Sequence, residues 1–142
     1  MIRTTLALLT ATLFVGCSAE EKRQDEPTGG HAHAHGPHGG HILEVGAHVA
    51  HLEVLHDKEE GKLTIYVLGS DVKTPLAVAT PPQLKLTTAD GPKVIDTKAQ
   101  DGSSSVFTVT DAALKGQEPE GRIAIEVKGK MYNPDLEHDH DH

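Results

Sequence analysis

Strict alternation of apolar and polar residues is the feature that most constrains how this chain can fold. In the segment HVAHLEVLH, residues 48–56, Ala50, Leu52 and Val54 share one parity, whereas His51 and Glu53 share the other. Successive side chains of an extended strand point to opposite faces. The segment therefore predicts a strand with its small and branched apolar residues in a core and His51 on a solvated face.

The same period of two recurs along the chain, separated by turn signals such as ADGP, DGSSS and PEG. The polar segment DKEEG joins the first strand to KLTIYVL, which is typical of a β-hairpin. DAALKGQ, residues 111–117, begins with a helix-capping residue and predicts one helical turn. We expect an Ig-like, all-β sandwich of six or seven strands over residues 41–133. The expected inward residues are Ala50, Leu52, Val54, Leu63, Ile65, Val67, Leu84, Leu86, Val94, Phe107, Val109, Ile123, Ile125 and Val127.

The first residues have the pattern of an export signal. An apolar run over residues 6–15 follows Arg3, and it is shorter than the roughly 20 residues that a membrane-spanning helix needs. The run ends in FVGC, which resembles the lipobox of bacterial lipoproteins. We expect residues 1–16 to be a lipoprotein signal peptide and Cys17 to carry the lipid that holds the protein on a membrane. An ordinary signal peptide cut elsewhere, or an uncleaved anchor, are the alternatives. Ser18 points to the periplasmic face of the outer membrane rather than the inner one.

Composition excludes several classes of function. The formal net charge of −8 repels nucleic-acid phosphates, so no nucleic-acid partner is expected. Two Phe, two Tyr and no Trp provide few aromatic platforms for sugars or bases. With its one cysteine assigned to the lipid, the mature chain has no thiol nucleophile or thiolate ligand. Because no catalytic motif is visible either, we do not expect an enzyme.

The chemistry of the chain lies in its eleven histidines. Neutral imidazole is a common ligand of Zn, Ni, Co and Cu(II), and His-x-His in extended chain places both rings on one side, about 6.5–7 Å apart. We expect two flexible segments, residues 17–40 and 134–142, to carry ligands for one of these divalent transition metals. The candidate ligands are His31, His33, His35, His38, His41, His138, His140 and His142, with His48, His51 and His56 as weaker candidates.

Two readings of the histidines stay open. In the first, the two His-rich segments bind metal for buffering or for delivery to a heavy-metal efflux system. In the second, the chain is a structural or protein-interaction sandwich on a lipid anchor. The tract over residues 31–41 would then be a pH-responsive linker, because histidine changes its charge between about pH 5 and 8. A neutral low-complexity spacer is a further alternative for the tract.

Residues 35–76, HGPHGGHILEVGAHVAHLEVLHDKEEGKLTIYVLGSDVKTPL, also carry a resemblance. The Pro-His-Gly-Gly start, the following strand, the IYVL strand and the KTPL turn resemble a His-rich domain of exported bacterial proteins. Such domains occur, for example, as N-terminal segments of the periplasmic adaptor proteins of heavy-metal RND efflux pumps. The segment TDAALKGQEPEGRIAIEVKGKMY and the acidic His tail are similar to the stand-alone lipoprotein form of this family, so the resemblance spans most of residues 35–142. It implies a β-sandwich and a role in periplasmic metal handling, with His35, His38, His41 and His51 at matching positions. The chain departs from the pattern at HVAHLEVLH, and it lacks the other domains of an adaptor.

Overall fold

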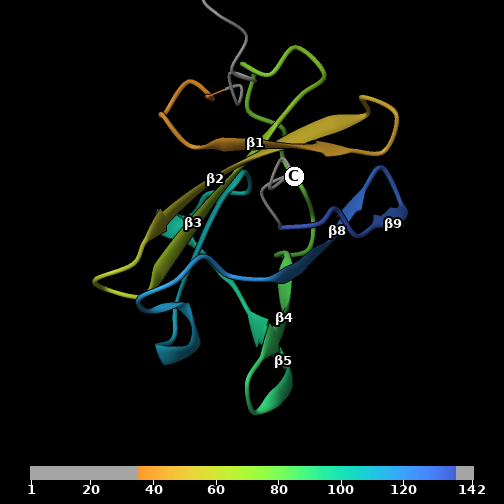
Figure 1. Cartoon of the computed structure of the whole chain (residues 1–142). Helices are drawn as coiled ribbons and strands as arrows, with labels where there is room; N and C mark the ends of the chain where they lie inside the picture. The colour runs from red at the N-terminus through yellow and green to blue at the C-terminus, as the bar shows by residue number, and fades with distance from the viewer. Residues whose placement is uncertain (1–34, 137–142) are drawn as a thin grey trace, which may run out of the picture. The chain divides into compact units, whose positions relative to one another are not determined.

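The computed structural model describes residues 35–136, which lie in one compact unit spanning Ala32–His142. Nine strands form two antiparallel sheets (Figure 1). The five-stranded sheet has the order β1 (His41–Val45), β2 (Ala50–Asp57), β3 (Lys62–Leu68), β7 (Val106–Thr110), β6 (Lys98–Ala99). The four-stranded sheet has the order β5 (Gly91–Asp96), β4 (Gln83–Thr88), β8 (Gly121–Val127), β9 (Lys130–Tyr132). The expected two-sheet, all-β architecture is confirmed. Its strands outnumber the six or seven expected, because the count includes elements as short as the two-residue β6.

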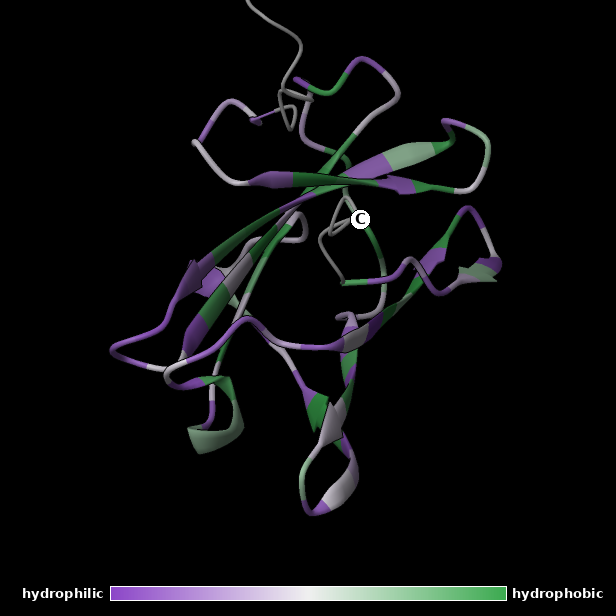
Figure 2. Ribbon diagram, viewed as in Figure 1, coloured by the Kyte–Doolittle hydropathy of each residue, from purple (hydrophilic) through white to green (hydrophobic). Residues whose placement is uncertain are grey.

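The core lies between the sheets, where apolar residues of alternate positions meet. Figure 2 shows hydrophobic and hydrophilic residues alternating along the strands. Leu52, Ile65, Leu84 and Ile123 are fully buried, as their parity predicts. Each such side chain contributes about 1.5–3 kcal/mol relative to an exposed position, so this alternation carries much of the stability of the fold.

The prediction that Val94 lies in the core is wrong, and the predicted helical turn after Asp111 is confirmed. Val94 is 62% exposed, because the side chain of this edge-strand residue points away from the core, and its neighbour Ile95 packs against the core instead. The helical turn expected near Asp111 is present as the 3-10 helix η2 (Ala112–Leu114), whose first turn is capped by the Asp111 side chain accepting from the Ala113 N–H. A second 3-10 helix, η1 (Gln100–Gly102), follows β6.

The strand β2 departs from simple alternation in a way that positions the candidate site. Ala50 to Val54 are all buried, although alternate residues should face solvent. β2 lies between β1 and β3, and its outer face is covered by chain from two loops, residues 35–40 and 69–75. Within residues 35–136, no helix is long and apolar enough to cross a membrane.

Candidate metal centre

The described end of the first His-rich segment is folded, which corrects the expectation of a flexible tract up to residue 40. His35 and His41 form an isolated antiparallel bridge, so the chain between them makes a closed turn. Within it the Gly36 N–H donates to the Gly40 carbonyl at 2.9 Å and the Gly39 N–H donates to the Gly36 carbonyl at 3.0 Å. We call residues 35–40 the His38 loop; it precedes β1 in Figure 1.

The His38 loop is tied to the sheet by one carboxylate, that of Glu53 in β2. The Glu53 side chain is fully buried, and its Oε1 accepts the backbone N–H groups of His38 at 2.7 Å and Gly40 at 2.9 Å. Its Oε2 lies 2.6 Å from Nδ1 of His38. Burial raises the pKa of Glu53, but these contacts from His38 and Gly40 outweigh it and hold the pKa below its usual value. A buried anion is thus compensated entirely by the loop that covers it.

The ring of His38 is held by a stacking contact on one face and by Glu53 at Nδ1. It stacks on Tyr66 of β3 with ring centroids 3.8 Å apart and an angle of 8° between the planes. The side chain is still 43% exposed. Because Nδ1 faces Glu53, the nitrogen left available to a ligand is Nε2.

The glycines of the segment HGPHGG explain why this loop can lie so close to the sheet. A Cβ on Gly36 would come within 2.3 Å of the Glu53 carboxyl carbon, and one on Gly40 within 2.6 Å of Leu55. Gly39 has φ of +83°, in the region that favours glycine. The sequence reasoning missed Glu53 and Tyr66 as parts of a site. The signal for them was the pair of glycines at 36 and 40, which suggests close backbone approach to a neighbouring strand.

His51 and His48 are placed differently from their predictions. His51 is only 6% exposed, and its Nδ1 lies 3.1 Å from the carbonyl oxygen of Gly69, so the expectation of a solvated surface residue is wrong. The loop after β3 covers this position, which the sequence period cannot show. His48 lies in the turn before β2 with φ of 55°, and its side chain is exposed.

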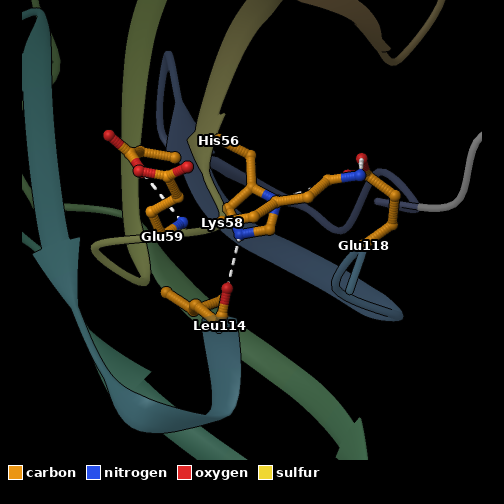
Figure 3. A network of polar contacts seen from close by, with 6 residues as sticks. His56, Lys58, Glu59, Leu114 and Glu118 are labelled. Atoms are coloured by element: carbon orange, nitrogen blue, oxygen red, sulfur yellow. Dashed lines mark hydrogen bonds and ion pairs between the residues drawn. The ribbon is translucent and has the colours of Figure 1, made fainter. Parts of the chain in front are cut away.

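His56 is fixed in a polar network at the far end of β2 (Figure 3). Its side chain is 8% exposed, with Nε2 at 2.6 Å from the carbonyl oxygen of Leu114 and Nδ1 at 3.3 Å from Oε2 of Glu118. Lys58 Nζ contacts the other carboxylate oxygen of Glu118 at 2.5 Å. Burial raises the pKa of Glu118, but Lys58 and His56 outweigh it and lower the pKa overall. Sequence reasoning missed Glu118 because 62 residues separate it from His56.

His41 and the end of the described chain lie together. His41 and Leu136 line one small cavity with Leu43, Val54 and Glu118. Leu136 is 5% exposed and donates its N–H to the Gly121 carbonyl, so the chain is anchored two residues before His138. The domain therefore extends to Leu136, past the expected boundary at 133.

The structure brings the candidate ligands together only in part. No group of three or more His, Cys, Asp or Glu residues that could hold a metal ion occurs among residues 35–136. His35 and His41 are bridged, His38 lies over Glu53, and His48 and His51 have ring centroids 5.9 Å apart. The remaining candidates lie outside the described residues: Cys17, His31, His33, His138, His140 and His142.

No protein-family model, curated protein or solved structure matches this chain.

Proposed function

We propose that the chain is a membrane-anchored periplasmic lipoprotein that binds a divalent transition metal, Zn, Ni, Co or Cu(II), through its His-rich segments. Metal buffering or delivery to an efflux system is the role we infer for it. The observation that carries the proposal is the common anchoring point of the two segments. His41 ends the His-rich tract over residues 31–41, Leu136 lies two residues before His138, and both residues line the same cavity.

Chain length then sets how far each segment reaches. An extended residue spans at most about 3.6 Å, so the backbone of His138 lies at most about 7 Å from that of the buried Leu136. On the other side, the bridge to His41 keeps His35 beside the start of β1. Histidines separated by about a hundred residues in sequence can therefore reach one ion. Bringing ligands from distant parts of the chain onto one ion costs chain entropy, so the expected affinity is moderate.

Calorimetric titration of the full chain, purified without an affinity tag, tests the proposal. Zn, Ni, Co and Cu(II) are each added to the wild type and to two variants. One variant has alanine at 31 and 33, and the other has alanine at 138, 140 and 142. If the segments share one ion, each variant loses the same binding event. Failure of every ion to bind the wild type more tightly than about 100 μM contradicts the proposal.

A second candidate function, a protein-interaction module, is favoured by one observation. β5 and β9 are the edge strands of the four-stranded sheet, and they expose Val94 and Met131, which are 62% and 57% exposed. A partner strand can pair with such an edge. Capture of one membrane partner that persists in the presence of chelator would support this candidate, whereas chelator-sensitive capture would support the metal role.

A further inference from the structure

The pair formed by His38 and Glu53 has the geometry of a metal-binding histidine with its orienting carboxylate. In metal sites the ligating histidine donates its other ring N–H to a carboxylate or a carbonyl, which fixes the tautomer and the ring orientation. Here the Nδ1 of His38 lies 2.6 Å from Oε2 of Glu53. An ionised carboxylate only accepts hydrogen bonds, so this contact requires the proton on Nδ1. The lone pair of the neutral ring is then on Nε2.

We propose that Glu53 is a positioning residue that presents His38 as an Nε2 ligand for a divalent transition-metal ion on the outer face of the five-stranded sheet. This inference rests on the proposed function and gives it a specific place. The His38 loop would then be a preformed mount for one ligand, instead of a length of flexible chain.

Three contacts fix the ring before any ion arrives. The backbone N–H groups of His38 and Gly40 are both held by Glu53 Oε1, and the ring stacks on Tyr66. A ligand held in this way loses little rotamer freedom on binding, which favours affinity. The buried Glu53 charge behind the ring further favours a cation at Nε2. Among the described residues, the nearest candidates in sequence for a further ligand are the exposed His35 and the half-buried His41, each three residues away.

The chain contains its own matched control for this arrangement. Glu44 and His48 make the same two contacts, a backbone N–H to Oε1 at 3.1 Å and Nδ1 near Oε2 at 3.5 Å. Both distances are longer than those of the His38 pair, and the side chains of His48 and Glu44 are 73% and 47% exposed. Solvent competes with so open a pair, so Glu44 should not fix the tautomer of His48.

Long-range ¹H–¹⁵N NMR on the metal-free wild type tests the tautomer directly. The expected result is a His38 ring that carries its proton on Nδ1. A ring in which Nε2 alone is protonated would overturn the inference, whatever the variants do.

The decisive substitution is Glu53→Gln in the full chain, titrated with Zn²⁺ and Co²⁺. The amide oxygen can still accept the two backbone N–H groups, but its NH₂ then faces Nδ1 of His38 and moves the ring proton to Nε2. We expect affinity to fall about 10–100-fold, the range that follows loss of an orienting partner. Glu44→Gln should leave affinity within about twofold. Affinity unchanged by Glu53→Gln would overturn the inference.

His38→Ala keeps the test valid if Glu53→Gln does not fold. It should lower affinity by about tenfold or more, because it removes the ligand itself. If Glu53→Gln does fold, the double variant should lose no more than His38→Ala alone, because Glu53 acts through His38. If the wild type binds no ion, the proposed function itself fails. If the wild type binds and His38→Ala binds equally well, only this inference fails.

Discussion

The close approach of the His38 loop to β2 predicts a large effect of a single methyl group at position 36. Gly36→Ala would place a Cβ 2.3 Å from the carboxyl carbon and 2.6 Å from Oε1 of Glu53, a separation that real atoms do not tolerate. Gly36 has no positive φ, so the backbone itself accepts alanine. The carboxylate must move away from its three partners in His38 and Gly40, or the loop must lift off the sheet.

The size of the effect follows from those contacts. A hydrogen bond to a charged group contributes about 1.5–3 kcal/mol, but a lifted loop regains water and chain entropy. We therefore expect Gly36→Ala to lower the free energy of unfolding by about 3 kcal/mol, less than the sum of three bonds. Gly39→Ala is the control, because its Cβ meets nothing within 4 Å. Its φ of +83° costs about 1–2 kcal/mol for an L-residue, offset by about 0.4–1 kcal/mol of reduced unfolded-state entropy.

Urea denaturation at pH 7 gives the two free energies, and amide hydrogen exchange gives their location. Gly36→Ala should speed exchange at the Gly40 N–H, while amides of β3 keep their protection. The reasoning is refuted if Gly36→Ala costs no more than Gly39→Ala, or if the Gly40 amide stays protected in the variant.

Three further predictions concern the rest of the fold. The pKa of Glu118 is lowered from 4.5, so its carboxylate stabilises the fold above that pH, and this contribution is lost as the pH falls below it. In chemical denaturation, the free energy of unfolding of Glu118→Gln should therefore decrease less than that of the wild type between about pH 5 and 3. His56→Ala should lower the free energy of unfolding by about 2–3 kcal/mol in chemical denaturation, because it removes a side chain that is only 8% exposed and leaves the Leu114 carbonyl without its ring partner. A loss under about 1 kcal/mol would contradict a stabilising role of this network. Gly121→Ala should lower the free energy of unfolding by more than about 3 kcal/mol or prevent folding, since φ is +141° and the Cβ would lie 2.1 Å from the Lys85 carbonyl oxygen. A melting temperature equal to that of the wild type would disprove this close approach.

The sandwich could be predicted from sequence because its strands alternate cleanly. Leu63, Ile65 and Val67 occupy one face of β3 and are fully buried, as a period of two requires. Local pattern also placed the cap at Asp111, since that signal depends only on neighbouring residues. Edge positions were harder, and Val94 shows why: at the edge of a sheet, register decides which of two adjacent apolar residues faces inward.

The candidate site could be predicted only as a list of histidines. Glu53 looked like a solvated strand residue, because nothing in its own segment shows that the chain before β1 folds back over it. The same holds for His51, which the loop carrying Gly69 covers. Both contacts join residues 13 to 18 apart through tertiary structure, so they depend on how the two loops fold and not on periodicity.

The burial of β2 on both of its faces has a consequence for mutational tolerance. A typical strand of a sandwich accepts many residues at every second position, because those side chains meet only water. From Ala50 to Val54 no position of β2 has that freedom, since the odd-numbered residues support the covering loops and the even-numbered ones fill the core. Substitutions in related sequences should therefore be rare at those five consecutive residues and more frequent on the solvent-facing sides of strands such as β5.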